Sequence, residues 1–228
     1  GTYSIAGSEF EGKTIVLNND ILINENVLNE DGTLNEENAS TFVQWEPIGE
    51  PYYVGDVSNS TVRIEVENQK VFKGTLDGKK YNIKGIYINK GLEWNQSLIS
   101  ESYGTVKNIN MIDGYLHAEG QYVSGVVGRS LGTVKDCYSN ITIVGGDYWY
   151  YHTGICAWNG GVVENCVNEG AVSGPNGVGV VGYNRGSVIG CINKAEIDGI
   201  SGVVGHSDPS DCDTLIKDCV NMGNVTST

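Results

Sequence analysis

Several features that would point to common classes of protein are scarce in this chain of 228 residues. Lys and Arg together number 14 against 28 Asp and Glu, which gives a net charge of −14 and leaves no basic cluster. Phosphate backbones and anionic lipids repel such a chain, so we expect no nucleic-acid partner. No run approaches the roughly 18 apolar residues of a membrane-spanning helix, so we expect no membrane span.

Proline is also rare, with 4 residues against 32 glycines, and long apolar stretches with helical periodicity are missing. Asparagine is frequent between short apolar pulses. Glycine and asparagine mark turns, and short apolar segments between turns are typical of strands. The composition therefore predicts an all-β protein.

One pattern occurs four times between Tyr122 and Thr228, each time as a glycine-rich strand followed by a valine or isoleucine and a cysteine. The cysteines stand at the same point of each copy, 29, 25 and 28 residues apart: Cys137, Cys166, Cys191 and Cys219. Self-similarity with a period in the twenties indicates coils stacked into a solenoid. A degenerate fifth copy covers 98–109, so the solenoid begins before Tyr122.

The spacing inside a copy predicts where the chain turns. A first apolar position is followed by a second one seven residues later, by the cysteine position three residues after that, and by a last apolar residue six further on. Side chains on one face of a strand need even spacings, so seven and three require corners. The residues just before the cysteine position tolerate a left-handed backbone: Asn108, Asp136, Asn165, Gly190 and Asp218. We predict a three-faced, right-handed parallel β-helix.

The N-terminal part is less regular. Two apolar pulses at 14–17 and 21–23 predict short strands, and 24–57 reads as a long loop or irregular cap. The alternation over 61–66 predicts a half-buried strand, and 72–89 reads as a coil. We therefore expect strands, loop and cap over 1–60 and β-helix coils over 61–228.

The segment 177–186 (GVGVVGYNRG) and its weaker copies at 124–132, 153–161 and 201–205 resemble the GLUG-motif repeat family. The segments 12–21 and 72–89 resemble those that precede such repeats in bacterial surface proteins, so the resemblance covers most of the chain apart from 24–57. Valine replaces the family's leucine, and Ala157 replaces a glycine. The resemblance implies a right-handed β-helix in an extracellular setting, as in adhesin-like proteins and the non-catalytic region of immunoglobulin-A-cleaving metallopeptidases. It carries over no catalytic residue.

The repeated cysteines have a structural interpretation. No two of the six lie within the C-x₂₋₄-C spacing of thiolate metal sites, and parallel in-register side chains fit disulfide geometry badly. We expect reduced, buried thiols stacked one per coil, with Cys212 as an exposed exception in a loop. Beside them we expect an asparagine ladder of Asn168, Asn193 and Asn221 that begins at Ser139.

Two insertions break the repeat, at 145–151 and 207–213, and loops on one face of a solenoid often bind ligands. The first is aromatic, and a stack of outward residues (Arg129, Trp158, Tyr183 and His206) would extend its surface. The candidate ligand-binding residues are Tyr148, Trp149, Tyr150, Tyr151, Trp158 and Tyr183. The alternative is that these rings fold onto the outer face and bury themselves.

The second insertion holds three carboxylates, Asp208, Asp211 and Asp213, which form a weak calcium candidate because their spacing differs from that of an EF-hand loop. The sequence indicates no cofactor.

For an enzyme, the aligned outward positions Lys135, Glu164, Ile189 and Lys217 are a mixture rather than a carboxylate cluster, and the three histidines do not recur in register. We therefore expect a non-enzymatic, adhesin-like module at the cell surface, its signal peptide removed, that binds a glycan or an extracellular protein or acts as a stalk. The alternative function is that of a carbohydrate-active β-helix enzyme, a polysaccharide lyase or hydrolase.

Overall fold

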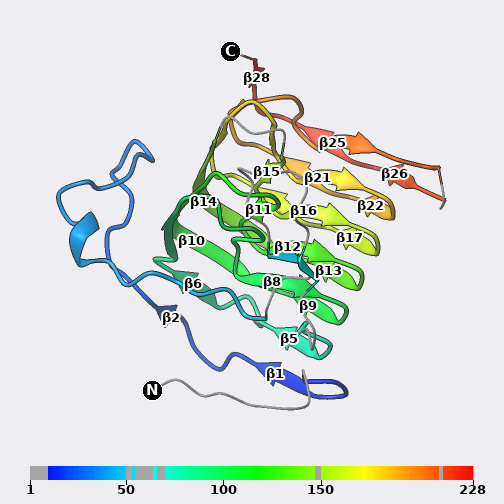
Figure 1. Ribbon diagram of the computed structural model, residues 1–228, viewed down its shortest axis with the longest axis horizontal. Coiled ribbons are helices and arrows are strands. Elements are labelled where there is room, and N and C mark those ends of the chain that lie inside the picture. The colour runs from blue at the N-terminus through cyan, green and yellow to red at the C-terminus, as the bar shows by residue number, and fades with distance from the viewer. Residues whose placement is uncertain are drawn as a thin grey trace.

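The computed structural model describes residues 10–49, 53–54, 64–65, 70–146, 150–210 and 213–227. In it the chain rises from the N-terminus to the C-terminus as a stack of coils (Figure 1). Within these ranges the regular structure is β apart from one short 3-10 helix, η1 (Ala39–Thr41). None of the described helical structure is long and apolar enough to cross a bilayer. The all-β parallel β-helix predicted from the sequence is confirmed.

Successive coils add their strands to three main sheets, of seven, five and eleven strands. The seven-stranded sheet consists of β1 (Thr14–Val16), β5 (Thr75–Asp77), β9 (Thr105–Lys107), β13 (Thr133–Lys135), β17 (Val162–Glu164), β22 (Ser187–Ile189) and β26 (Leu215–Lys217). The five-stranded sheet consists of β8 (Ile99–Ser102), β12 (Val127–Ser130), β16 (Cys156–Asn159), β21 (Val181–Asn184) and β25 (Val204–Ser207). Neighbouring strands in both sheets pair in parallel.

The eleven-stranded sheet is the longest. Its main path is β2 (Ile21–Leu22), β6 (Asn82–Lys84), β10 (Asn110–Ala118), β14 (Tyr138–Gly145), β18 (Val167–Asn168), β23 (Ile192–Asn193) and β27 (Val220–Asn221). Alongside that path lie β7 (Tyr87–Lys90), β19 (Val172–Ser173), β24 (Ile197–Asp198) and β28 (Val225–Thr226). A further three-stranded sheet, which the spacing argument does not predict, contains β11 (Val123–Ser124), β15 (His152–Thr153) and β20 (Gly177–Val178).

The core lies between the sheets as columns of equivalent residues. One column runs through the centre of the seven-stranded sheet and is at most 5% exposed at each of these positions: Leu76, Val106, Val134, Val163 and Val188. Burying one such aliphatic side chain contributes roughly 1.5–3 kcal/mol. Because each column is completed only by the neighbouring coils, the coils stabilise one another and a single repeat buries little by itself.

The predicted corners are confirmed by the backbone. The residue before the cysteine position has a positive φ in every copy, namely Asn108 (55°), Asp136 (53°), Asn165 (51°), Gly190 (62°) and Asp218 (55°). A left-handed residue is costly for most side chains and tolerable for glycine, asparagine and aspartate. The corner residues therefore determine where the chain leaves the seven-stranded sheet for the eleven-stranded one.

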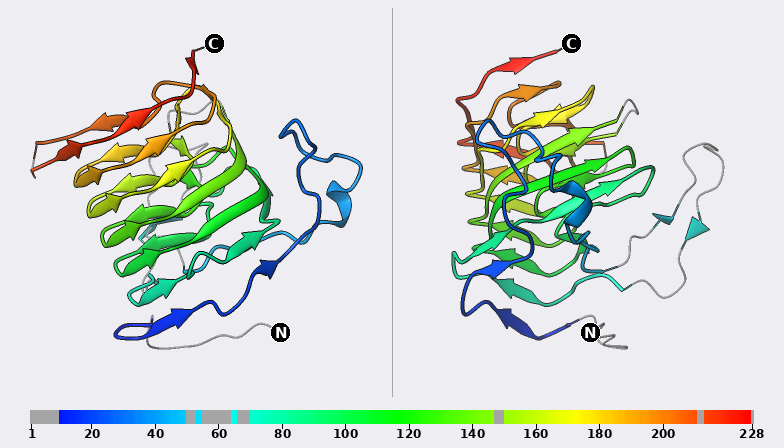
Figure 2. Two further views of the ribbon diagram at one scale, coloured as in Figure 1. Left: turned by 180° about the vertical axis from the view of Figure 1, so that it is seen from behind. Right: turned by 90° about the vertical axis from the view of Figure 1, so that its left-hand side faces the viewer.

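The N-terminal strands extend the solenoid, because β1 pairs in parallel with β5 and β2 with β6. The segment 24–48 then projects beside the eleven-stranded sheet (Figure 2). It is fastened there by Asn24, whose Nδ2 donates to the Gly85 carbonyl at 2.7 Å, and by the Leu28 amide, which donates to Asp113 at 3.0 Å. The expected boundary between 60 and 61 lies outside the described residues. Of the strand expected over 61–66, Ile64–Glu65 is described as β4, which pairs antiparallel with β3 (Tyr53–Val54).

Candidate functional site

Four outward side chains of the five-stranded sheet stack in register along the solenoid, and we call them the ring ladder: Arg129 on β12, Trp158 on β16, Tyr183 on β21 and His206 on β25. The Arg129 guanidinium lies 4.5 Å from the centre of the Trp158 ring. The Trp158 and Tyr183 rings are 6.4 Å apart and inclined by 10°, and the Tyr183 and His206 rings are 5.1 Å apart and inclined by 21°. The predicted outward stack is therefore present.

This stacking decides what the ring ladder offers to a ligand. Trp158 has the guanidinium on one face and Tyr183 on the other, so its ring edge remains for contact. At its C-terminal end the stack finishes on His206, which is exposed. A ring edge carries a partial positive charge and the faces are negative, so the surface suits polar acceptors and the faces of other rings.

Carboxylates hold two members of the ring ladder, Arg129 and Tyr183. Arg129 forms an ion pair with Glu101, whose side chain is fully buried. At the other end the Tyr183 hydroxyl donates to Asp208 Oδ2 at 2.6 Å. That hydrogen bond to the carboxylate, together with partial burial, raises the pKa of Tyr183 to about 12. The rings are thus fixed before any ligand arrives, which lowers the entropy cost of binding.

Of the predicted aromatic loop, the structure brings one residue to the ring ladder. Tyr151 is half-buried, and its ring centre lies 6.2 Å from that of Tyr183. It packs over Gly182, where a Cβ would come within 2.3 Å of Tyr151, so the absence of a side chain there makes room for the tyrosine. Tyr150 instead contacts Trp94, 6.4 Å away between ring centres. Tyr148 and Trp149 lie outside the described residues.

In the acidic loop, the carboxylate of Asp208 accepts hydrogen bonds from within the chain. Asp208 Oδ1 accepts hydrogen bonds from the Ser210 amide at 2.9 Å and the Ser210 hydroxyl at 2.5 Å. The Ser210 hydroxyl, followed by that of Tyr183, holds the Asp208 pKa well below its usual range. Asp213 is exposed, and Asp211 lies outside the described residues. In the described part of the chain no three metal-ligating side chains gather, so the calcium candidate gains no support from geometry.

The cysteine interpretation is confirmed for the described thiols. Cys137, Cys166 and Cys191 are free and buried, and Cys219, in the last coil, is free and partly exposed. Cys156 is a further buried thiol in the five-stranded sheet, and burial raises its pKa to about 12. These thiols are therefore packing residues rather than nucleophiles. Cys212 lies outside the described residues.

The predicted asparagine ladder is also confirmed. Asn168 Nδ2 donates to Asn193 Oδ1 at 3.0 Å, and Asn193 Nδ2 donates to Asn221 Oδ1 at 2.8 Å. A second ladder was missed: Asn159 Nδ2 donates to Asn184 Oδ1 at 2.8 Å, one residue beyond the ring ladder in the chain. Asn159 and Asn184 each follow the first core position of their strand by three residues, and this shared spacing could have revealed the second ladder. The second ladder fastens the coils within the sheet that carries the ring ladder, and the first fastens them within the eleven-stranded sheet.

The outward positions of the seven-stranded sheet are mixed, as expected. Asp77 is nearly buried, but hydrogen bonds from Asn108 and Lys79 and the Lys107 ammonium outweigh the effect of burial and hold the Asp77 pKa well below its usual range. Further along the column, Lys135, Glu164, Ile189 and Lys217 face outward in register. A carboxylate already saturated with hydrogen bonds is a poor proton donor, so Asp77 is poorly suited to act as a general acid.

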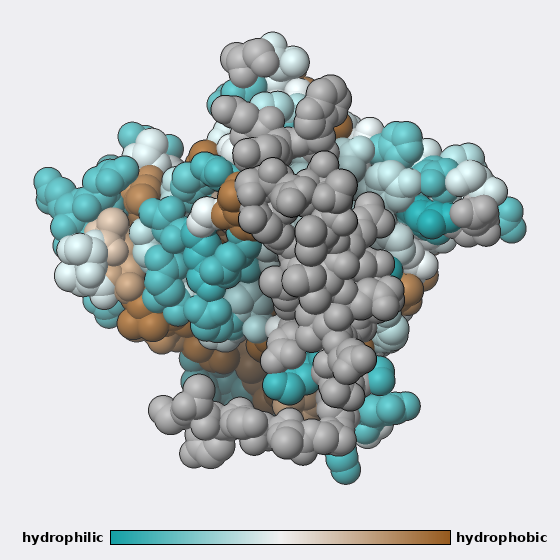
Figure 3. Space-filling model, in the orientation of Figure 1, coloured by the Kyte–Doolittle hydropathy of each residue, from teal (hydrophilic) through white to brown (hydrophobic). Residues whose placement is uncertain are grey.

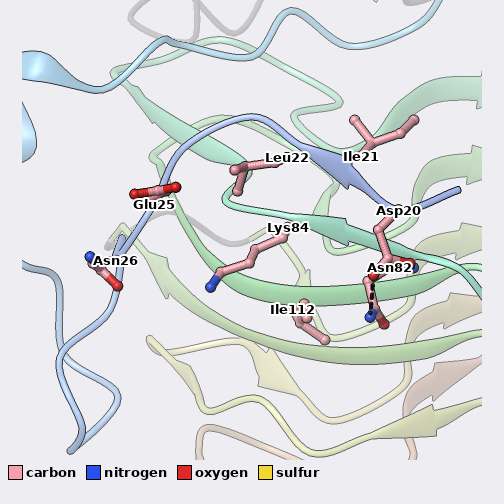
Figure 4. A pocket seen from close by; sticks show the side chains of 8 residues that line it. All are labelled: Asp20, Ile21, Leu22, Glu25, Asn26, Asn82, Lys84 and Ile112. Carbon is pink, nitrogen blue, oxygen red and sulfur yellow. Dashed lines mark hydrogen bonds between the residues drawn. The ribbon is translucent and has the colours of Figure 1, made fainter.

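Two cavities lie beside the eleven-stranded sheet. One, of about 250 Å³, is lined by β2, β6 and β10 (Figure 4). Two of its three charged groups have partners, because Asp20 accepts from Asn82 and Lys84 pairs with Asp113 at 3.4 Å, and the third, Glu25, is exposed. Ile21 and Leu22, which line this cavity, are exposed. Figure 3 shows that this side of the molecule carries apolar as well as hydrophilic surface. The other cavity, of about 800 Å³, lies between 29–37 and β10, β14 and β19.

Comparison with known proteins agrees on the fold. The chain is similar to the crystal structure of a candidate immunoglobulin A1 protease from Bacteroides ovatus, solved at 1.30 Å, with a TM-score of 0.58 and 17% sequence identity. The match covers 94% of this chain and 61% of that one, so the chain spans less than two thirds of its neighbour. No protein-family model matches the chain. No curated protein matches it either. At this level of identity the likeness shows the fold, a parallel β-solenoid.

Proposed function

We propose that this chain is a non-enzymatic, adhesin-like binding module of an extracellular protein, and that the ring ladder with Tyr151 is its contact surface. The observation that carries the proposal is the stack of Arg129, Trp158, Tyr183 and His206 on a rigid sheet. Tryptophan, tyrosine and arginine are the residues that most often dominate binding energy at interfaces.

The geometry favours a protein over a flat-lying sugar. A sugar ring binds best on an open aromatic face, and both faces of Trp158 are covered. The remaining edges, with the Tyr151 ring beside them, form a ridge that fits a groove or polar loop of a partner. Because the similar structure is named for immunoglobulin A1, immunoglobulin A1 is the first protein to try.

Binding of the chain to immobilised immunoglobulin A1, to other extracellular proteins and to a glycan array tests the proposal. Trp158→Ala opens the middle of the ring ladder and should weaken binding by at least about tenfold, as expected for a hot-spot residue. Tyr81→Ala is the matched control, because Tyr81 is exposed on a corner away from the five-stranded sheet and should bind like the unsubstituted chain. Equal binding by both variants, or binding to none of the probes, would contradict the assignment.

The non-enzymatic part has its own check. Incubation with acidic polysaccharides should release no reducing ends, and incubation with immunoglobulin A1 should leave its heavy chain intact. An extracellular setting predicts that the protein is recovered from the secreted or surface-exposed fraction of its source cells. Cleavage of either substrate class by the purified chain would overturn the proposal in favour of an enzyme.

A further inference from the structure

The larger cavity beside the eleven-stranded sheet, of about 800 Å³, is bounded by a segment that the sheet itself holds in place. That segment, 29–37, runs alongside the sheet (Figure 2), and side chains of β10, β14 and β19 form the floor. At its base the Leu28 amide donates to Asp113 at 3.0 Å. At its tip the Thr142 hydroxyl donates to the Gly32 carbonyl at 2.6 Å. The volume lies within the roughly 300–1,000 Å³ of small-molecule sites, and fastened walls lower the entropy cost of binding.

The floor of this cavity offers one aromatic face to a ligand. Tyr87, Tyr115 and Thr142 follow one another in register from coil to coil. The Tyr87 ring stacks on one face of Tyr115, with the ring centres 6.3 Å apart and the planes inclined by 28°. On the other side the column continues with the short side chains of Thr142 and Ala171, and no second ring of the described residues stacks there. Because Tyr115 lines the cavity, it has the open face that Trp158 lacks.

The wall of the cavity is rich in hydrogen-bond acceptors. Carboxylates of Asp31, Glu36 and Glu37 line it, and none of its lining residues is a lysine, arginine or histidine. Glu36 and Glu37 are exposed, and within the described part of the chain their carboxylates have no ion-pair or hydrogen-bond partner. Burial and then the negative charge of Glu36 raise the pKa of Tyr115, as expected for a carboxylate near the ring hydroxyl. Such a lining favours a ligand that donates hydrogen bonds and carries positive charge, and it repels an acidic one.

The asparagines of the lining add no free donor, because both side-chain amides already donate to carbonyl oxygens of the same segment. We propose that this cavity binds a short oligosaccharide of amino sugars. One sugar ring lies with its C–H groups, which are partially positive, on the negative face of Tyr115. Its ammonium and hydroxyl groups donate to Glu36 and Glu37. The site is on a different sheet from the ring ladder, so it does not depend on the proposed function.

A lysine-rich peptide is the competing occupant, since it also donates hydrogen bonds and carries positive charge. It would use the carboxylates, but a thin side chain would fill little of the 800 Å³ and would not need a flat platform. The flat ring and the carboxylates at its edge together fit a ligand that is itself a ring with donors around its rim. Loss of affinity on removal of the Tyr115 ring therefore separates the two occupants.

Isothermal titration calorimetry of the whole chain tests the proposal with three tetrasaccharides, of glucosamine, of N-acetylglucosamine and of galacturonic acid. Glucosamine should bind tightest, its neutral analogue more weakly, and the acidic one not at all. Tyr115→Ala should weaken binding of the first two by about tenfold or more, whereas Tyr115→Phe keeps the ring and should bind within about twofold of the unsubstituted chain. Tyr103→Ala is the matched control, because Tyr103 is exposed at a corner beyond the five-stranded sheet.

A second variant tests the carboxylates without touching the core. Glu36→Gln combined with Glu37→Gln changes two exposed side chains, and it should weaken glucosamine binding and remove most of its dependence on salt. Affinity for the neutral analogue should change little. Unchanged glucosamine affinity in this variant, or equal affinity of Tyr115→Ala and Tyr103→Ala, overturns the proposal. So does binding of a lysine tetrapeptide that is as tight as that of glucosamine and indifferent to Tyr115→Ala, which would assign the cavity to a basic peptide.

Discussion

Replacing Asn193 by alanine tests how much the buried amide ladder stabilises the coils. Asn193 is fully buried, accepts from Asn168 at 3.0 Å, and donates to the Ala195 carbonyl at 3.0 Å and to Asn221 at 2.8 Å. The substitution leaves a buried donor on Asn168 and a buried carbonyl on Ala195 without this partner. Each such orphan costs about 1–3 kcal/mol, so with two of them the free energy of unfolding should fall by about 2–6 kcal/mol.

Asn221→Ala is the matched control, because it makes the same change in the same ladder at an exposed position. Water can replace its lost bonds, so this variant should lose only about 1 kcal/mol. Urea unfolding followed by circular dichroism measures both, with the comparison valid where the denaturant slope m is unchanged. Equal losses for the two variants would refute the reasoning, because burial would then not determine how much the side-chain amide contributes to the free energy of unfolding.

Three further predictions concern the corner, the core and the pH dependence. Asn165→Val forces a β-branched residue into φ = 51° and should destabilise the chain by about 1–3 kcal/mol in urea unfolding, whereas Asn165→Gly should cost less than Asn165→Val. Val181→Asp places an unpaired charge in the core and should abolish cooperative unfolding, and a well-folded variant would contradict the assigned column. Burial lowers the His152 pKa to about 4, so the unfolded chain binds more protons than the folded one between pH 6.5 and 4. As the pH is lowered from 6.5 to 4, the free energy of unfolding should therefore fall by up to about 1.4 kcal/mol per pH unit. The His152→Leu variant should show a flatter dependence of stability on pH.

Much of the fold could be predicted because the repeat records backbone geometry directly. The spacings of seven and three fix the corners, and the corner residue before each cysteine position is an asparagine, aspartate or glycine with a left-handed backbone, as Asn165 and Gly190 show. The cysteine and asparagine columns follow from the same alignment. The extra sheet of β11, β15 and β20 could not be predicted, since its strands are two residues long and carry no periodicity.

The candidate site was harder to predict in detail. In-register pairing predicts that Trp158 and Tyr183 are neighbours, but the direction of a loop side chain depends on contacts from distant segments. Tyr150 turns toward Trp94, which precedes it by about two coils, while Tyr151 packs over Gly182. The covered faces of Trp158 also follow from three-dimensional stacking, and they shift the expected ligand from a sugar ring to a protein.

Pulse alkylation of the Cys212→Ser chain under native conditions tests the coil stack most directly. Cys137, Cys166 and Cys191 are buried in one column of successive coils, Cys156 is buried in the five-stranded sheet, and Cys219 in the last coil is partly exposed. The structure predicts that Cys219 is labelled first and that the other four are labelled only as the chain unfolds in urea. Labelling of Cys166 as fast as Cys219 would contradict the stacked core on which the fold and both proposals rest.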